Sequence, residues 1–353
     1  RKKPVKVIAL TGKTIVSVAG GGGPQSGAAG GHSLALDSTG HVWAWGGNGH
    51  GELGQGTTDS SAHSTPVEVK AGLQGGTYLG DTSSIVAIAG GRYHDLAVSA
   101  DGKVWAWGDG GSGQLGDGTS GQASTPVKVS QTTMVNAVID VAAGEEHSLA
   151  IDSAGKVWAW GQNADGELGD GTNTSASTPV SVTIPGSRSA VYLAGAATHS
   201  VAVTSDGTAW AWGDNSRGEL ARSGGGTTNS LVAVQMYTST GAITNVIAAA
   251  AGEDHSVLLT GAGAVWAAGH NAYGEVGDGT TRQRNVLVQA KTSSGMSNAI
   301  AIAAGQDHSI AVSGGNVYTF GFNQTSSMSP AGGGQLGDGT TTNRSTAVKV
   351  LAL

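Results

Sequence analysis

The chain has 353 residues, a formal charge of −7 and only 12% charged residues. This balance gives no basic footprint for DNA or RNA, so no nucleic-acid partner is expected. Gly accounts for 61 residues and Pro for 7, which together stay below the share typical of low-complexity disorder. The sequence contains no Cys, which excludes disulfides, thiolate metal sites and a cysteine nucleophile.

The apolar stretches of the sequence are short. The longest, such as residues 246–251 and 299–304, fall far below the roughly 20 residues that cross a bilayer, so we expect a soluble protein without membrane insertion. Residues 1–7 lack the apolar core of a signal peptide.

The first predicted element is a strand within residues 1–10, where Val and Ala alternate with Lys and Ile from residue 4 onward. We expect residues 4–10 either to add an outer strand that closes a ring or to reach a neighbouring subunit in a homo-oligomer or assembly. A frayed terminus is the alternative.

Six copies of one repeat follow and fill the chain. Each copy has the phrase His-Ser-Leu-Ala-Leu or a variant, beginning at His32, His94, His147, His199, His255 and His308. Variants of Val-Trp-Ala-Trp-Gly, Gly-Glu-Leu-Gly-Asp-Gly-Thr and Thr-Pro-Val-x-Val come next. We place the repeats at residues 11–70, 71–130, 131–183, 184–236, 237–290 and 291–353 of a single domain, 1–353.

Each phrase alternates with a period of two and is bounded by Gly, Asp, Ser or Thr, which predicts short strands. In the third repeat these are strand a (138–142), strand b (147–151), strand c (156–160) and strand d (179–182). The b–c turns carry Gly at 40, 102, 155, 207, 263 and 315. Four antiparallel strands repeated six times predict an all-β fold, a β-propeller with six blades favoured and seven open; a linear solenoid is the alternative.

The run Val-Ala-Ala-Gly-x-x-His-Ser-Leu-Ala, followed by Gly-x-Val-Trp-Ala-Trp-Gly and Gly-Glu-Leu-Gly-Asp-Gly-Thr, resembles the repeat of the regulator of chromosome condensation superfamily. That family includes an exchange factor for a small nuclear GTPase, a plant ultraviolet-light receptor, accessory domains of ubiquitin ligases and a bacterial secreted inhibitor of β-lactamases. The resemblance implies a propeller, typically of seven blades. The Trp motif of the photoreceptor is not found, so no chromophore role is assigned.

The repeated residues are interpreted as scaffold. All nine Trp lie in strand c and are expected to pack between blades. The repeat His is expected to hydrogen-bond neighbouring backbone rather than to form a triad with Asp37 or Asp152. The Asp of Gly-Asp-Gly-Thr, at 117, 170, 278 and 338, is interpreted as a turn cap rather than a Ca²⁺ ligand. No metal, cofactor or catalytic residue is expected.

Function is expected where the repeats differ. Strand order places the a–b turns and c–d loops at one end of the blades, around a central channel, and loops on a rigid scaffold commonly carry function. The predicted binding residues are Arg92, Tyr93, Glu145, Glu146, Glu253, Asp254, Gln306 and Asp307 in the turns and His50, Asp165, Arg217 and Tyr273 in the loops. We expect a non-enzymatic scaffold that binds a protein or surface polymer, as a subunit of a bacterial extracellular or cell-surface assembly.

Other functions stay open. A carbohydrate-binding or enzymatic propeller would use the channel mouth, where Tyr93 and Tyr273 neighbour Glu145 or Glu275. The resemblance also keeps an exchange factor in view, because acidic residues occupy comparable turns. A β-lactamase inhibitor is the other family function, although only Tyr93 is aromatic where that inhibitor has mostly aromatic pairs.

Overall fold

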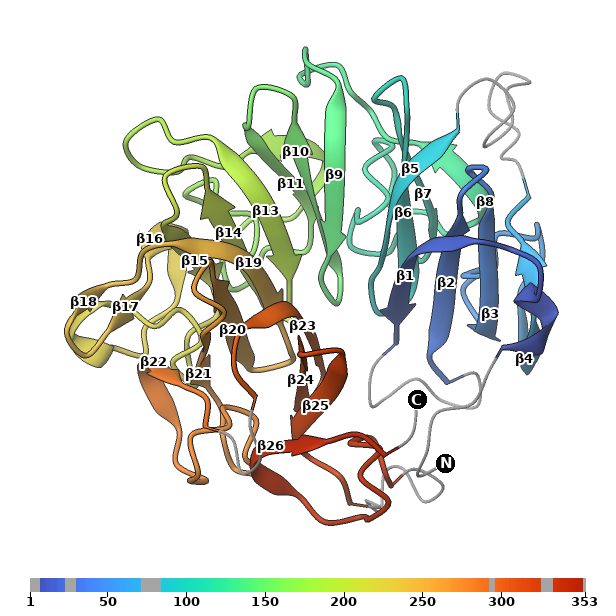
Figure 1. Cartoon of the computed structure of the whole chain (residues 1–353). Helices are drawn as coiled ribbons and strands as arrows, with labels where there is room; N and C mark the ends of the chain where they lie inside the picture. Colours follow the sequence, from blue (N-terminus) through green and yellow to red (C-terminus); the bar gives the residue numbers. More distant parts are fainter. Residues whose placement is uncertain (1–6, 23–29, 71–83, 292–295, 325–332, 352–353) are drawn as a thin grey trace. The chain divides into compact units, whose positions relative to one another are not determined.

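The structure is a computed structural model that describes residues 7–22, 30–70, 84–291, 296–324 and 333–351 (Figure 1). The described residues fall into two compact units. We call residues 7–183 the N-terminal unit and residues 184–353 the C-terminal unit, and we describe each by itself.

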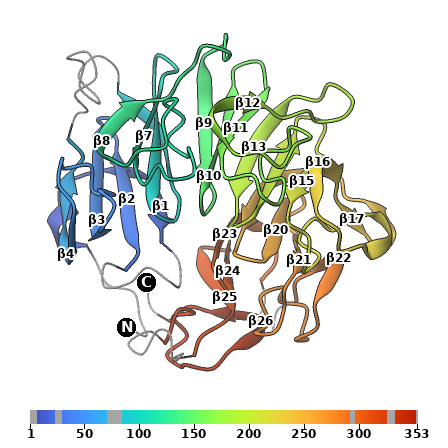
Figure 2. The same ribbon diagram turned by 180° about the vertical axis from the view of Figure 1, so that it is seen from behind.

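The N-terminal unit contains three sheets of four antiparallel strands, which we number as blades 1 to 3. Blade 1 comprises β1 (Ile15–Gly21), β2 (His32–Asp37), β3 (Val42–Asn48) and β4 (Asp59–Glu68). Blade 2 comprises β5 (Ile85–Gly90), β6 (His94–Ser99), β7 (Val104–Gly108) and β8 (Ala123–Lys128). Blade 3 comprises β9 (Val138–Ala143), β10 (His147–Asp152), β11 (Val157–Gly161) and β12 (Ala176–Ser181). The first strands of the three blades, β1, β5 and β9, are neighbours (labelled in Figure 1), and Figure 2 shows the same sheets from behind.

The C-terminal unit contains blades 4 to 6. Blade 4 comprises β13 (Ala190–Gly195), β14 (His199–Thr204), β15 (Ala209–Gly213) and β16 (Ser230–Gln235). Blade 5 comprises β19 (Val246–Ala251), β20 (His255–Thr260), β21 (Val265–Gly269) and β22 (Arg284–Gln289). Blade 6 comprises β23 (Ala299–Gly305), β24 (His308–Ser313), β25 (Asn316–Gly321) and β26 (Arg344–Lys349). A short 3₁₀ turn, η2 (Ser223–Gly225), lies in the c–d loop of blade 4.

These sheets confirm the predicted fold class, an all-β propeller of six four-stranded antiparallel blades. Strands a, b and c of blade 3 match their predicted bounds to within one residue. The Gly of every b–c turn has a positive φ, between 72 and 86°, as a tight hairpin requires. A Cβ added at Gly102 would lie 2.4 Å from the Cβ of Ala137, so the turn also needs the missing side chain.

Two expectations about strands need correction. Residues 8–10 form a 3₁₀ turn, η1 (Ile8–Leu10), instead of a strand, because the Leu10 N–H bonds back to the Val7 carbonyl (3.4 Å). Residues 4–6 of the predicted strand lie outside the described residues. Strand d of blade 3 spans Ala176–Ser181 instead of the predicted 179–182, and it tolerates Pro179 because the outer N–H positions of an edge strand need no partner.

Blade 5 carries an addition that the repeat pattern does not predict. A hairpin of β17 (Tyr237–Thr238) and β18 (Gly241–Ala242) extends its outer edge, where Thr238 pairs in parallel with Leu287 of β22.

The prediction of a single domain stays a prediction. In the part of the chain that the structure describes, no helix has the length and apolar character to traverse a membrane.

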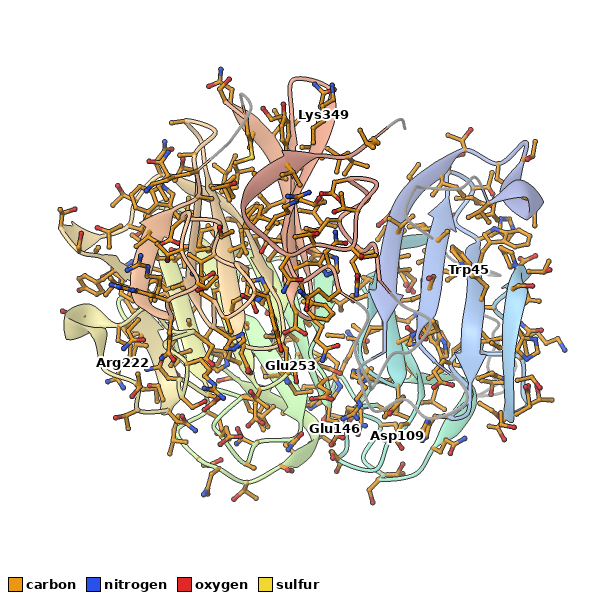
Figure 3. The ribbon with its side chains drawn as sticks, turned by 90° about the horizontal axis from the view of Figure 1, so that it is seen from below. Trp45, Asp109, Glu146, Arg222, Glu253 and Lys349 are labelled. Carbon is orange, nitrogen blue, oxygen red and sulfur yellow. The ribbon has the colours of Figure 1, made fainter. Side chains whose placement is uncertain are left out.

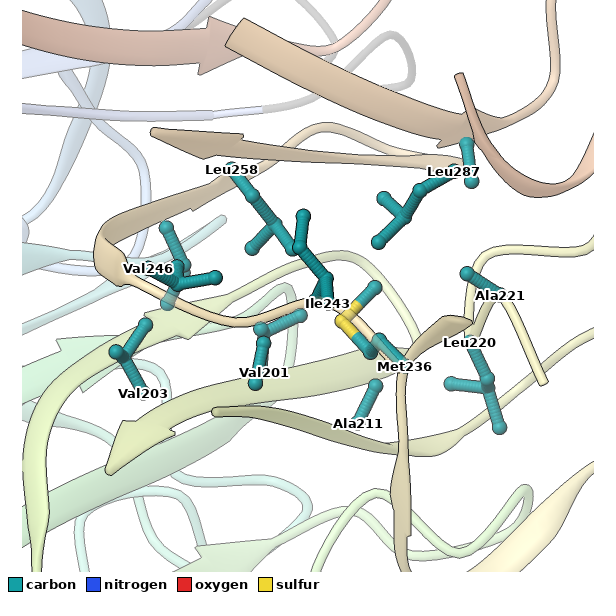
Figure 4. Packing of buried hydrophobic residues seen from close by; sticks show 14 residues of the cluster. Val201, Val203, Ala211, Leu220, Ala221, Met236, Ile243, Val246, Leu258 and Leu287 are labelled. Atoms are coloured by element: carbon teal, nitrogen blue, oxygen red, sulfur yellow. The ribbon is translucent and has the colours of Figure 1, made fainter. Parts of the chain in front are cut away.

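The hydrophobic core of each unit lies between neighbouring blades. Trp107 of blade 2 is fully buried among residues of blade 1, including Leu34 and Leu53. Figure 4 shows the corresponding cluster of the C-terminal unit, where Val201 of blade 4 faces Leu258 of blade 5. Six of the nine Trp are buried, which confirms the packing role predicted for them, whereas Trp43, Trp45 and Trp266 are only half-buried.

Candidate functional site

The repeat His joins each blade to the next within a unit. His94 Nε2 lies 3.0 Å from Ser148 Oγ, and that hydroxyl donates to the Gln114 carbonyl (2.8 Å). Because the single Ser hydrogen is used for the carbonyl, the His Nε2 must carry the proton and donate. Burial, and then the nearby His147 and His32, lower the pKa of His94 to about 3, which keeps it neutral. The same relay runs through His199, Ser256 and the Glu219 carbonyl, and through His255, Ser309 and the Glu275 carbonyl.

One junction departs from this relay. Between blades 1 and 2, Asp95 replaces the Ser, and its Oδ1 lies 2.8 Å from His32 Nε2. Burial lowers the pKa of His32, but the charge and hydrogen bond of Asp95 outweigh it and leave that pKa raised. For Asp95, burial is the largest effect and raises the pKa of the carboxyl group. Among the described residues, Asp95 Oδ2 has no hydrogen-bond partner.

The Asp at the end of strand b does not belong to a triad. Asp152 and His147 stand at opposite ends of β10. Asp152 Oδ1 accepts the N–H groups of Ala154 and Lys156, and its Oδ2 accepts the indole N–H of Trp158 (3.1 Å). The residue therefore closes the b–c turn and fixes a Trp ring, a role that sequence reasoning did not predict.

The c–d loops are closed by an Asn that sequence reasoning missed. Asn163 Oδ1 accepts the Leu168 N–H (2.9 Å), while its Nδ2 donates across the loop to the Thr172 and Thr174 carbonyls. Equivalent bonds are made by Asn48, Asn215, Asn271 and Asn323. The signal in the sequence is an Asn two residues after the Gly that ends strand c.

The Glu of Gly-Glu-Leu is also part of the loop. Glu167 Oε2 accepts the Asp165 N–H (2.8 Å), and the same bond is made by Glu52, Glu219 and Glu275, and by Gln114 in blade 2. The Asp of Gly-Asp-Gly-Thr caps its turn: Asp117 Oδ1 accepts both the N–H (2.9 Å) and the hydroxyl of Thr119. Asp170, Asp278 and Asp338 do the same, which confirms the turn-cap interpretation.

The a–b turns and c–d loops share one end of each unit, as predicted. In every blade the N–H after strand c bonds to the carbonyl of the residue before the repeat His, for example Asp109 to Tyr93 (2.8 Å) and His270 to Asp254 (2.8 Å). We call this the loop end of each unit.

The loop end of the N-terminal unit is internally paired. Arg92 forms an ion pair with Glu145 and lies 4.9 Å from the centre of the Tyr93 ring, which in turn lies 4.4 Å from the ring of His50. Glu146 accepts a hydrogen bond from Ser112 Oγ (2.9 Å), and Figure 3 shows Glu146 and Asp109 at this end. Asp165 lies in the equivalent c–d loop of blade 3.

The loop end of the C-terminal unit gathers its carboxylates into two compact sets. Gln306 donates to the Glu253 carboxylate, and Arg217, in the c–d loop of blade 4, donates its backbone N–H to Glu219. Asp254 lies with Asp214 and Glu219, and Asp307 lies with Glu275 and His270, each set having one ligand atom per residue within 4.8 Å of the others. Tyr273 packs its ring against His270 (5.9 Å) and Phe322 (4.8 Å).

Burial and mutual repulsion raise several carboxyl pKa values at this end. Burial, followed by the charges of Glu253 and Glu275, raises the pKa of Asp307 to about 6. Burial, followed by Glu253, raises the pKa of Asp254. Burial raises the pKa of Glu219 to about 8. Cationic groups would therefore be favoured here.

The structure thus places six predicted binding residues at each loop end: His50, Arg92, Tyr93, Glu145, Glu146 and Asp165 in the N-terminal unit, and Arg217, Glu253, Asp254, Tyr273, Gln306 and Asp307 in the C-terminal unit. Their role in binding stays a prediction. His270 and Asp214, which were not predicted, belong to the same end.

Comparison with known proteins finds relatives that match most of this chain at slightly more than 30% identity. Human E3 ubiquitin-protein ligase HERC2 is 32% identical over 315 residues, covering 87% of this chain but only 6% of HERC2. The ultraviolet-B receptor UVR8 of Arabidopsis thaliana is 31% identical over 324 residues, covering 90% of this chain and 68% of UVR8.

Solved structures show the same fold. Prp20p of Saccharomyces cerevisiae has a TM-score of 0.79 at 24% identity, with 99% of this chain and 80% of that chain covered. Human WBSCR16 has a TM-score of 0.79 at 22% identity, with 97% and 82% covered. The family model of the RCC1-like domain matches residues 1–352. On this match over nearly the whole sequence, the chain belongs to the RCC1-like domain family.

Proposed function

We propose that the chain is a non-catalytic scaffold that binds a protein partner through its loop ends. The observation that carries this proposal is that the residues that recur between blades hold the fold, whereas the residues that vary lie at the loop ends. The His, Asp, Asn and Glu that recur from blade to blade are engaged in relays, turn caps and loop closure. The side chains that differ between blades stand on that fixed backbone at the loop ends, where binding residues are commonly found.

Relatives support a protein as the partner. The structural report on Prp20p concerns its binding to Gsp1p and histones. A second yeast structure, 25% identical to this chain with a TM-score of 0.79, is Kap60 bound to yeast RCC1 (Prp20) and covers 99% of this chain and 78% of that one. We transfer from these only the class of ligand, a protein.

Charge indicates which kind of protein surface would fit. At the loop end of the N-terminal unit, Arg92 already neutralises Glu145. At the loop end of the C-terminal unit, burial and then the charge of Glu253 raise the pKa values of Asp254 and Asp307, and a basic surface would relieve that repulsion. We therefore propose a basic partner segment that docks mainly on the C-terminal unit.

A carbohydrate ligand is less well supported. The Glu275 carboxylate, one candidate sugar contact, is fully buried and already accepts the Tyr273 N–H (2.9 Å). From composition alone we further propose a bacterial extracellular or cell-surface location, which detection of the chain in culture medium or on intact cells would test.

The test compares partner recovery by charge variants. Immobilised parent chain is incubated with lysate and with culture medium, and the retained proteins are quantified by mass spectrometry. The double variant Glu253→Gln with Asp254→Asn should lose at least about tenfold of the specific partner. The matched control is Glu68→Gln with Asp101→Asn, which removes two charges from outer strand β4 and a b–c turn and should retain it. Equal loss in both variants, or in neither, would contradict docking at the loop end.

A further inference from the structure

His270, Glu275 and Asp307 form a compact group at the loop end of the C-terminal unit, between blades 5 and 6. We propose that these three side chains bind one divalent transition-metal ion, with Zn²⁺ as the representative ion. Neither the family match nor the binding role proposed above assigns a metal to this place, and the proposal does not depend on that role.

The backbone holds the three residues in position. His270 directly follows β21, and its N–H donates to the Asp254 carbonyl (2.8 Å). Asp307 directly precedes β24, and its carbonyl accepts the Phe322 N–H (2.7 Å). The Glu275 carboxylate is held by the Tyr273 N–H. Three ligands on pinned backbone give a partly pre-formed site, so little order must be gained when an ion binds.

The distances suit a single ion. One ligand atom from each residue lies within 4.8 Å of the other two, and His270 Nδ1 lies 2.8 Å from Glu275 Oε1. Metal–ligand bonds of about 2.0–2.2 Å place two ligands of one Zn²⁺ no more than about 4.4 Å apart. Small side-chain rotations therefore bring all three atoms into one coordination sphere.

The donor set fits a transition metal better than Ca²⁺ or Mg²⁺. One imidazole nitrogen with two carboxylates is a common set for Zn²⁺ and its neighbours, whereas the hard cations take oxygen ligands. The Glu275 side chain is fully buried and that of His270 is 23% exposed. Three protein ligands leave a fourth coordination position, which water or a donor atom of a bound molecule would fill.

The scaffold does not require this combination. At the position of His270 the other blades have Gly47, Asp109, Gln162, Asp214 and Phe322. At the position of Asp307 they have Gly31, Tyr93, Glu146, Thr198 and Asp254. Only Glu275 performs a loop-closing task that its counterparts share. An imidazole facing a carboxylate across a blade junction is thus a local addition to the repeat.

Asp307 adds a second, independent indication. Within the described residues its carboxylate accepts no hydrogen bond, although Glu275 and Glu253 lie close enough to raise its pKa. A half-buried carboxylate next to like charges is costly unless a cation compensates it. His270 supplies a compensating charge only when protonated, whereas a divalent ion would compensate both carboxylates at once.

The neighbouring junction provides a matched control. Asp214, Glu219 and Asp254 occupy the three equivalent positions between blades 4 and 5 with similar spacing, but this set contains no imidazole. A carboxylate-only set has a lower preference for Zn²⁺, so Asp254→Asn should leave the tight Zn²⁺ site intact.

The experiment is calorimetric titration of the chelator-treated, dialysed full chain with Zn²⁺ alone. Parent chain should bind one tight equivalent, which His270→Gln and Asp307→Asn each weaken at least about tenfold while Asp254→Asn does not. Co²⁺ titration should give a ligand-field absorption band that the same two variants lose. Circular dichroism before titration identifies a variant that fails to fold, in which case the other one decides. Absence of tight binding by parent chain, parent-like binding by both site variants, or equal loss in Asp254→Asn would overturn the proposal.

Discussion

Glu219 is a carboxyl group that the fold holds in its neutral form. It is 1% exposed, and burial raises its pKa to about 8. The equivalent residue of blade 2 is an amide: Gln114 keeps the loop-closing bond through Oε1 and also donates from Nε2 to Asp109 Oδ2 (3.0 Å). Blade 4 has Asp214 where blade 2 has Asp109, so an amide at 219 would find the same partner.

We predict that Glu219→Gln removes a pH dependence of stability. Because the pKa of Glu219 is raised above its ordinary value of 4.5, its stabilising contribution is complete below about pH 4.5 and lost as pH rises through about 8. The Gln variant, neutral at every pH, should be more stable than parent chain by up to about 5 kcal/mol at alkaline pH, and similar to it in acid. Urea titrations at both ends of the range check this. A constant difference at both pH values would show that the carboxyl group does not titrate as described.

Asp95 offers a second prediction at this scale. Asp95→Ser should restore the His–Ser–carbonyl relay, with His32 as donor and the Glu52 carbonyl as acceptor, as at the other described junctions. We expect the free energy of unfolding to stay within about 1 kcal/mol of parent chain at neutral pH. Asp95→Ala leaves the buried His32 nitrogen without its partner and should cost about 1–3 kcal/mol. Chemical denaturation of the pair decides, and a Ser variant as unstable as the Ala variant would contradict the relay.

Among the elements, strand c carries the largest buried side chains. Trp160 of β11 is fully buried among residues of blade 2, and its indole N–H donates to the Gln114 carbonyl (2.9 Å). Trp45 of β3 occupies the equivalent position in blade 1 and is only half-buried.

Trp160→Ala should therefore lower the free energy of unfolding by about 3–5 kcal/mol, because it empties a large buried site and removes one of the two hydrogen bonds to the Gln114 carbonyl. Trp45→Ala serves as the matched control and should lower the free energy of unfolding clearly less, since the Trp45 ring buries less apolar surface on folding. Guanidinium titration of the two variants tests the order. Equal losses would mean that burial between blades does not set the contribution of this residue.

The elements that repeat could be predicted from the sequence, and those that do not repeat could not. Period-two alternation and a Gly at each b–c turn specify strands a to d locally. The hairpin β17–β18 is too short for any period, and η1 depends on a local turn at Leu10 that overrides the alternation before it. Strand order also predicted the composition of the loop ends.

The contacts at the loop ends were beyond the sequence. The partner of His94 lies 54 residues away in another blade. The approach of Asp307 to His270 depends on how the c–d loop of blade 5 lies against the a–b turn of blade 6. Spacing along the chain reports neither distance. This is why the scaffold role of the repeat His could be predicted, whereas the predicted backbone partner was wrong: the ring bonds to a Ser hydroxyl or to the Asp95 carboxylate of the next blade.

At the scale of the whole molecule, the two units each contain complete blades with their own clusters between them. The connection between β12 and β13 is mostly exposed and includes positive φ angles at Gly186 (83°) and Ser187 (51°). Exposed segments of this kind tolerate insertion and cleavage, because few packed groups depend on them.

A protease site inserted at Gly186–Ser187 should therefore be cut without loss of the sheets. We expect far-ultraviolet circular dichroism and the buried-Trp fluorescence to change by less than about a tenth after cleavage, because each blade keeps its four strands on one side of the cut. A control site inserted in the turn between β10 and β11 would split a blade and should unfold it on cutting. Collapse of the signal after the first cut would contradict the independence of the sheets.

The His–Ser relay also affects how such a chain can change its number of blades. A blade that carries both the His donor and the Ser acceptor presents the same two connectors to either neighbour, so copying or losing that whole repeat leaves every remaining connector matched. Blade 2 is different, because its Asp95 requires a preceding His able to share a proton, as His32 does. The His32–Asp95 pair therefore favours blade 1 as the neighbour that precedes blade 2, whereas blades joined by His and Ser could exchange neighbours. This pair fixes the order of the first two blades, and with it the order of the loops that they carry.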